Sequence, residues 1–220
     1  MNNFAGYLLA QKSELWPKRI AARCQGRSLT YAQLSNLSQR FGSLLHFLGM
    51  RPGCRVAIAL PDSFSFLTAF LGCLWTGVVA MPQNNRMREL DYAEALACIG
   101  PGLMIAPPGH EALDAAWAAG LHVLELDDAS LPDLLEGHVQ APMHPSSADD
   151  DCVYFVTSGT TGHPKVVPHR HSDFFTVATS TGAFLEYRQD DVALCSAKLS
   201  HAYGMFASIT LPFKVGATTV

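Results

Sequence analysis

The sequence predicts an α/β fold in which mostly parallel sheets are covered by helices. Short apolar and β-branched runs alternate with longer helix-like runs through the first 127 residues. Strict alternation of this kind is typical of a parallel sheet with helices on its faces. In addition, 49% of the 220 residues are hydrophobic and only 15% are charged, so the chain can bury a sizeable core.

The first well-marked helix is expected to begin at Thr30. The Thr30 hydroxyl can accept a hydrogen bond from the backbone N–H of Gln33, and the Gln33 side chain can accept one from the backbone N–H of Thr30, which is the pattern of a capping box. Apolar residues then recur at steps of three and four as far as Leu48, making one stripe that faces a core. Gly49 or Gly53 is expected to end the helix.

A long uncharged segment, from Ser63 to Gln83, has to be weighed against a membrane span. Gly77 and the valines after it favour another interpretation, because glycine ends helices and paired β-branched residues favour strands. We therefore expect a buried helix followed by a buried strand. The full alternation expected here is strand 55–60, helix 63–76, strand 78–82, helix 88–99, strand 103–106, helix 110–119 and strand 121–126.

Composition divides the chain into three predicted parts. Residues 1–127 form the first βα portion, and 128–150, rich in Asp, Pro and Ser, form a surface connection. Residues 151–220 form the portion that carries the main functional motif. In that last part we expect strand 152–157, strand 165–167, helix 171–185, strand 192–196, helix 203–214 and, at 215–220, a strand cut short.

The main motif lies at residues 154–165, Tyr-Phe-Val-Thr-Ser-Gly-Thr-Thr-Gly-His-Pro-Lys. Glycines let backbone N–H groups face an anion, the hydroxyls add donors, and Lys165 adds a charge that can reach a terminal phosphate. A Walker-type loop would need Gly before the lysine and Ser or Thr after it. Here Pro164 precedes and Val166 follows, which favours a strand at Lys165. A hairpin without any ligand is the plainest alternative.

The pattern Thr-Ser-Gly-Thr-Thr-Gly-x-Pro-Lys at 157–165 resembles the phosphate-binding signature of the adenylate-forming enzymes, which include acyl- and aryl-CoA ligases, peptide-synthetase adenylation domains and beetle luciferases. Val166 stands where that superfamily commonly has Gly. Weaker similarities lie at 29–34, 52–58 and 77–82, with Cys54 in place of a usual Asp. The resemblance implies the incomplete N-terminal part of the superfamily's large domain.

The resemblance also implies the ligands and their contacts. ATP, Mg²⁺ and coenzyme A or a phosphopantetheine carrier are the implied cofactors, and a small carboxylic acid is the implied substrate, with an acyl-carrier protein as a further candidate partner. Lys165 would act catalytically by offsetting charge on the departing pyrophosphate, and Thr160 would contact the metal. The residues implied to wrap the phosphates are Thr157, Ser158, Gly159, Thr160, Thr161 and Gly162.

A second motif, Lys-Leu-Ser-His-Ala-Tyr-Gly-Met at 198–205, is similar to benzoate-type aryl-CoA ligases and points to an aromatic acid. The resemblance implies that His201 lies over the carboxylate pocket and gates it, with Tyr203 and Gly204 as further acid-binding residues. By residue chemistry alone, a histidine beside a tyrosine is as readily a structural residue.

These observations predict an N-terminal fragment of an AMP-forming acid–thiol ligase that is inactive alone. The sequence holds no Tyr-Gly-x-Thr-Glu segment, which the superfamily uses for adenine. Two alternatives stay open, namely a catalytically silent interaction module and a P-loop-like kinase or ATPase. The Pro-Lys-Val order speaks against the second.

Other functions are disfavoured by charge and cysteine usage. The formal net charge is −4 and basic residues are scattered, whereas nucleic-acid binding needs clustered Lys and Arg. Six cysteines occur singly, without a Cys-x-x-Cys pair, which indicates free thiols and, with no signal-peptide pattern, a cytoplasmic protein. His169 and His171 are interpreted as surface residues and not as a zinc site.

Overall fold

The apolar runs expected as strands form a six-stranded sheet in the computed structural model, which describes residues 2–158 and 164–220. The strand order is β6-β5-β3-β4-β7-β8, and every pair is parallel except β7 with β8. Its strands are β3 (Arg55–Ile58), β4 (Val79–Pro82), β5 (Leu103–Ala106), β6 (His122–Glu125), β7 (Asp151–Ser158) and β8 (Pro164–Arg170). The predicted α/β class with mostly parallel sheets is confirmed.

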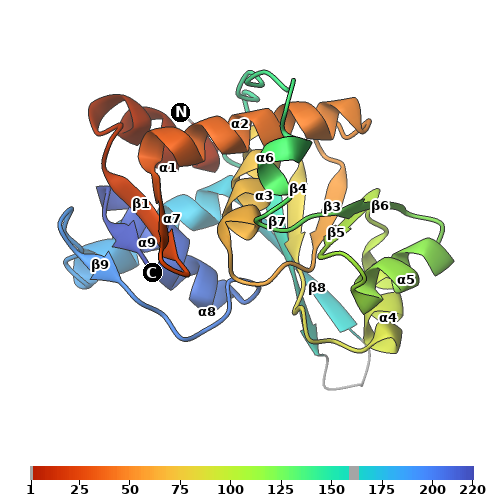
Figure 1. Cartoon of the computed structure of the whole chain (residues 1–220). Helices are drawn as coiled ribbons and strands as arrows, with labels where there is room; N and C mark the ends of the chain where they lie inside the picture. The colour runs from red at the N-terminus through yellow and green to blue at the C-terminus, as the bar shows by residue number, and fades with distance from the viewer. Residues whose placement is uncertain (1, 159–163) are drawn as a thin grey trace.

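Helices cover both faces of this sheet, as Figure 1 shows. Successive residues of a strand point to opposite faces, and in β3 Val56 and Ile58 join one buried cluster while Ala57 joins the other. The first cluster includes side chains from α2 (Tyr31–Phe47) and α3 (Phe64–Trp75). The second includes side chains from α4 (Glu89–Ile99) and α5 (Glu111–Ala118).

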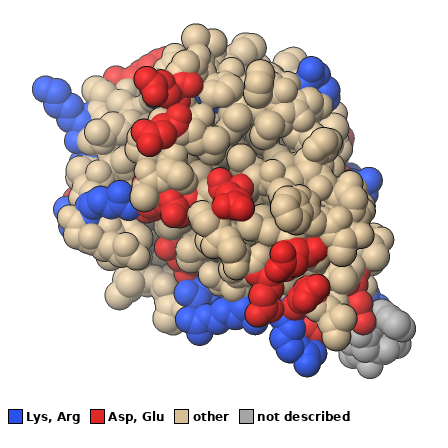
Figure 2. Space-filling view, turned by 45° about the vertical axis from the view of Figure 1, so that its right-hand side comes forward, with Lys and Arg blue, Asp and Glu red and all other residues tan. Residues whose placement is uncertain are grey.

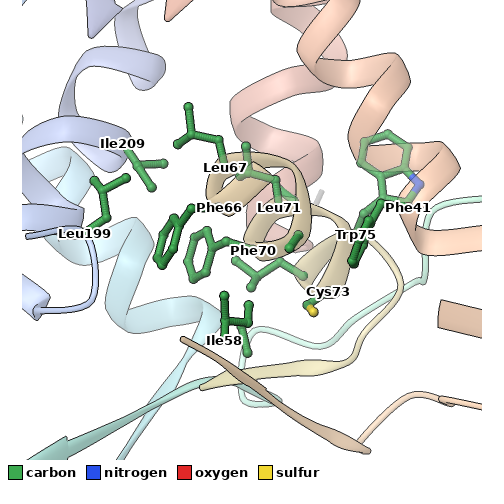
Figure 3. Close-up of a cluster of buried hydrophobic side chains, with 14 of the residues drawn as sticks. Phe41, Ile58, Phe66, Leu67, Phe70, Leu71, Cys73, Trp75, Leu199 and Ile209 are labelled. Atoms are coloured by element: carbon green, nitrogen blue, oxygen red, sulfur yellow. The ribbon is translucent and has the colours of Figure 1, made fainter. Parts of the chain in front are cut away.

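The two helices with the clearest sequence signals form as expected. Thr30 caps α2 with the predicted capping box, completed by Gln33. Every residue of α3 is buried, and Figure 3 shows its side chains packed against Phe41 and Ile58. Within the described part of the chain, no helix combines the length and the apolar character needed to cross a membrane.

The hairpin and the N-terminal helix were not expected from the sequence, and the strands predicted at 192–196 and 215–220 form only as the short β9 and β10 of a second sheet. The second sheet has the order β2-β1-β10-β9 among the described residues, and its first two strands form a hairpin. Helix α1 (Phe4–Leu15) packs against α2 and α3. The strands are β1 (Ile20–Cys24), β2 (Arg27–Thr30), β9 (Val192–Ala193) and β10 (Thr218–Thr219).

The helix predicted at 203–214 forms as one continuous helical run, and a π-helical turn lies inside it. The run consists of α8 (Ala202–Met205), the π-helical turn η1 (Phe206–Thr210) and α9 (Leu211–Val215). Pro212 accounts for the wider turn, because proline has no backbone N–H to donate and its ring clashes with the carbonyl four residues earlier. Helix α7 (His171–Phe184) lies close to the 171–185 expected.

The segment 128–150, expected as a surface connection, lies along α2 and α3. It includes the short helix α6 (Leu131–Leu134) and buries Leu135 completely. The backbone carbonyl of Ala141 accepts a hydrogen bond of 2.9 Å from Trp75 Nε1, and the carbonyl of Trp75 accepts one of 2.9 Å from His144 N. These contacts fix the segment to the C-terminal end of α3.

His171 is not a surface residue, so that prediction is wrong. Its side chain is only 1% exposed, and its Nδ1 accepts a hydrogen bond of 3.1 Å from the backbone N–H of Phe4. The helices α1 and α7 meet at this contact, which no local pattern in the sequence indicates. His169 is half-buried and lies 3.6 Å from Asp173.

Candidate functional site

Strands β7 and β8 flank the segment predicted to grip phosphate. Thr157 stands opposite Lys165 in the antiparallel register, and Thr157 Oγ1 donates a hydrogen bond of 3.4 Å to the carbonyl of Lys165. Both side chains are exposed. The lysine therefore lies in a strand, as predicted, and not at the start of a helix as a Walker loop requires.

Part of the predicted phosphate grip lies outside the described residues. Gly159, Thr160, Thr161 and Gly162 belong to the segment 159–163 and stay predictions. Ser158 is placed by its backbone as the last residue of β7, opposite Pro164.

A cavity of about 340 Å³ opens beside this strand pair. It lies at the carboxyl ends of β4 and β7, where open α/β sheets bind their ligands. Thr157 and Pro164 border it from the predicted phosphate grip, and Ser200 and His201 border it from the second motif. The remaining lining residues are Pro82, Gln83, Asn84, Met87, Asp91, Glu94, Ala95 and Val156.

Sequence reasoning missed the wall formed by the residues after β4 and by α4. Gln83 is 2% exposed, and its backbone N–H donates a hydrogen bond of 2.8 Å to the carbonyl of Ile58. Asp91 is hydrogen-bonded by Arg88, which holds the pKa of this carboxyl below its usual range. The sequence signal that could have indicated this wall was the position of Gln83, which directly follows the carboxyl end of a buried strand.

A tight turn sets the direction of the chain at His201. The His201 backbone N–H donates a hydrogen bond of 3.0 Å to the carbonyl of Lys198. Gly204 packs against the same carbonyl so closely that a Cβ at this position would lie 2.1 Å from the oxygen. Glycine is needed here for close approach and not for a positive φ.

The structure thus brings together two of the predicted site residues and separates others. Thr157 and His201 border one cavity, whereas Lys165, Tyr203 and Gly204 are not among its lining residues. Tyr203 is 73% exposed and Gly204 is buried in the turn. A direct role of Tyr203 or Gly204 toward the acid therefore stays a prediction.

Among residues 2–158 and 164–220, no group of three or more His, Cys, Asp or Glu residues is arranged to hold a metal ion. Thr160, the predicted metal contact, lies in the undescribed segment. A Mg²⁺ ion at this cavity would depend on nucleotide phosphate oxygens for most of its ligands, as Mg²⁺ commonly does.

A family model and individual relatives both match this chain over most of its length. The model of the AMP-binding enzyme family matches residues 9–220. The benzoate–CoA ligase of Thauera aromatica is 34% identical over 209 residues, covering 88% of this chain and 38% of the relative. A feruloyl-CoA synthase of an Amycolatopsis species is 32% identical over 225 residues, covering 100% of this chain and 44% of the relative.

Solved structures show the same likeness. A benzoate CoA ligase from Burkholderia xenovorans LB400 superposes with a TM-score of 0.90 at 27% identity, covering 99% of this chain and 44% of that one. An anthranilate CoA ligase solved with anthranoyl-AMP gives a TM-score of 0.90 at 25% identity, with the same coverage. The chain spans 38–44% of the length of these four relatives. It belongs to the AMP-binding enzyme family.

Proposed function

We propose that the protein containing this chain uses ATP to convert a small carboxylic acid, aromatic in character, into an acyl-adenylate. The acyl group then passes to the thiol of coenzyme A or of a phosphopantetheine carrier. One observation carries the proposal: a single cavity is bordered by the ends of the phosphate motif, Thr157 and Pro164, and by His201. The aromatic character is supported by the relatives named for benzoate, ferulate and anthranilate.

The described side chains have distinct tasks in this reaction. The Thr157 hydroxyl, exposed beside the cavity, turns its one proton from the carbonyl of Lys165 to a phosphate oxygen, and the Lys165 side chain offsets the charge that develops on pyrophosphate. His201 orients the acid so that a carboxylate oxygen attacks the α-phosphorus while the bond from that phosphorus to the pyrophosphate oxygen breaks. Mg²⁺, when bound, supplies further neutralisation of phosphate charge.

Electrostatics favour phosphates on the strand side of the cavity. Asp91 and Glu94 line the α4 side, and like charges disfavour a polyphosphate next to them. Lys165 lies on β8, opposite Thr157. We therefore place the triphosphate along Thr157 and Lys165, and the acid toward His201.

The test is acid-dependent pyrophosphate release by the full-length gene product that contains this chain. Benzoate, 4-hydroxybenzoate, acetate and phenylalanine form a panel that separates aryl, short acyl and amino acids. We expect release with an aromatic acid and a His201→Ala variant with a raised KM for acid and a nearly unchanged KM for ATP. No release above the acid-free control with any acid would overturn the proposal and favour the catalytically silent interaction module.

A further inference from the structure

Asp62 ties the segment that carries His201 to the first part of the fold. Its Oδ1 accepts a hydrogen bond of 3.0 Å from the backbone N–H of Leu199, and its Oδ2 lies 3.4 Å from Lys198 Nζ. Lys198 and Leu199 come just before His201 in the sequence, whereas Asp62 lies in the loop between β3 and α3. One carboxylate therefore holds both the backbone and the side chain of the segment that leads into the cavity.

The loop that carries Asp62 is itself rigidly placed. On one side Leu60 is 2% exposed. On the other side the Ser63 hydroxyl caps α3 by accepting a hydrogen bond of 3.1 Å from the backbone N–H of Phe66. Because α3 is buried along its whole length, the backbone of the loop that carries Asp62 is held against the core at its α3 end.

The segment before His201 is also anchored by the side chain of Leu199, which packs into the core. The Leu199 side chain is 8% exposed, and Figure 3 shows it in the buried cluster with Leu67 and Ile209. Its backbone N–H is the group that Asp62 holds. With the Lys198 carbonyl already occupied by the turn to His201, the segment has little freedom to shift.

We propose that Asp62 is a positioning residue: through Leu199 and Lys198 it fixes where His201 stands at the cavity, and so sets the affinity for the acid. The inference rests on the proposed function in assigning His201 to the acid. Asp62 itself is not among the residues that line the cavity, so its effect on the acid passes through the segment it holds.

The kinetic test compares Asp62→Ala, His201→Ala and the double variant in the full-length protein. Losing the hydrogen bond to Leu199 should raise the KM for acid about three- to tenfold and leave the KM for ATP nearly unchanged. The double variant should resemble His201→Ala alone, because groups that act through one another are not additive. Fully additive effects, or an equal rise in both KM values, would overturn the proposal.

Two further variants separate positioning from general stability. Asp62→Asn keeps an oxygen for the Leu199 N–H and should restore most of the affinity for acid. Asp128 is the matched control, since it borders the same surface pocket as Asp62 but accepts hydrogen bonds from Ser65 and pairs with Arg27. Asp128→Ala should lower the melting temperature without changing the KM for acid, and a KM shift equal to that of Asp62→Ala would contradict the proposal.

A measurement on the 220-residue chain is independent of any activity. Amide hydrogen exchange at Leu199 should accelerate about three- to tenfold in Asp62→Ala and remain near the unsubstituted rate in Asp128→Ala. Unchanged exchange at Leu199 in Asp62→Ala would refute the positioning role even if the enzyme is active. Faster exchange combined with no pyrophosphate release by the unsubstituted protein would refute the proposed function and leave the Asp62 contact standing.

Discussion

Lys165 lies in a strand, as its neighbours in the sequence predicted. The Pro-Lys-Val order predicted a strand, and Lys165 is the second residue of β8, exposed and opposite Thr157. An exposed lysine on a strand edge can reach a ligand held above the strand end, whereas a Walker lysine acts from a helix N-terminus. Its role toward phosphate stays a proposal, and a substitution tests it.

Replacing Lys165 by alanine in the full-length protein should slow adenylation by roughly ten- to a hundredfold at saturating acid. One charge-assisted contact to a departing anion is worth about 1.5–3 kcal/mol. Single-turnover formation of acyl-adenylate measures this rate, and Lys18→Ala, at an exposed lysine outside both motifs, is the control. A raised KM for acid with unchanged use of ATP would show that the lysine does not serve the phosphate side.

His171 makes the stability of this chain depend on pH. The pKa of His171 is lowered from its usual 6.5 to about 4, chiefly by burial, with Asp150 opposing the shift and His144 adding to it. Protonated Nδ1 could no longer accept the hydrogen bond from Phe4. The unfolded chain therefore binds a proton that the folded chain refuses between about pH 6.5 and 4, and the free energy of unfolding must fall as pH falls through this window.

His171 should make the free energy of unfolding change with pH by a slope that approaches about 1.4 kcal/mol per pH unit between pH 6 and 5. Urea unfolding at several pH values measures it. His171→Asn should flatten the slope in this window whatever its effect on stability at pH 7. Identical slopes for His171→Asn and the unsubstituted chain would show that His171 is not the source of the pH dependence of stability.

At the scale of elements, Asn3 joins the start of α1 to the end of α3. Its Oδ1 accepts a hydrogen bond of 3.1 Å from Gly6 N, which caps α1, and its Nδ2 donates one of 2.7 Å to the carbonyl of Leu74. The residue is 1% exposed. One side chain therefore satisfies an N–H at one helix end and a carbonyl at another.

Asn3→Ala should cost more stability than Thr30→Ala, although both remove an N-terminal cap. The Thr30 cap hydrogen bonds are exposed, so its loss should cost about 1 kcal/mol in the free energy of unfolding. Asn3→Ala also removes the buried hydrogen bonds from Nδ2 to the carbonyl of Leu74 and to Ser146 Oγ, and should cost about 2–4 kcal/mol. Chemical denaturation compares them, and equal costs would mean that the bond to Leu74 contributes nothing.

Helix boundaries were predictable where local chemistry sets them. The capping box at Thr30 and the glycine at Gly77 marked real ends of α2 and α3, because caps and glycines act on their own neighbours. The bounds predicted for the helix at 203–214 are also close to those observed, but its π-helical turn was not predictable, since the apolar pattern continues unchanged across Pro212. Helix α1 was missed because its apolar residues form no clear one-sided stripe.

At the scale of the whole molecule, three features describe the chain: its surface charge, its cysteines and the share of its relatives' length that it spans. Figure 2 shows acidic and basic side chains interspersed with uncharged ones on the face that it displays. All six cysteines are free, as their spacing predicted. The chain spans 38–44% of the curated relatives described above, and its sequence holds no Tyr-Gly-x-Thr-Glu segment.

The 220-residue chain alone should therefore catalyse no acid-dependent exchange between ATP and pyrophosphate. Adenylation depends on holding adenine, phosphates and carboxylate together, and this sequence supplies a candidate for only the last two. The measurement is isotope exchange with the aromatic acid that the full-length protein prefers, using that protein as the positive control. Exchange above the acid-free background would contradict this expectation.

Periodicity and residues close together in the chain were enough to predict the α/β class, the succession of the main strands along the chain and the two motifs. The shared cavity of Thr157 and His201, the hydrogen bond of Asp62 to Leu199 across 137 positions and the burial of His171 became apparent only in the folded molecule. Such contacts arise from how distant segments pack around one core, and no local pattern encodes that packing.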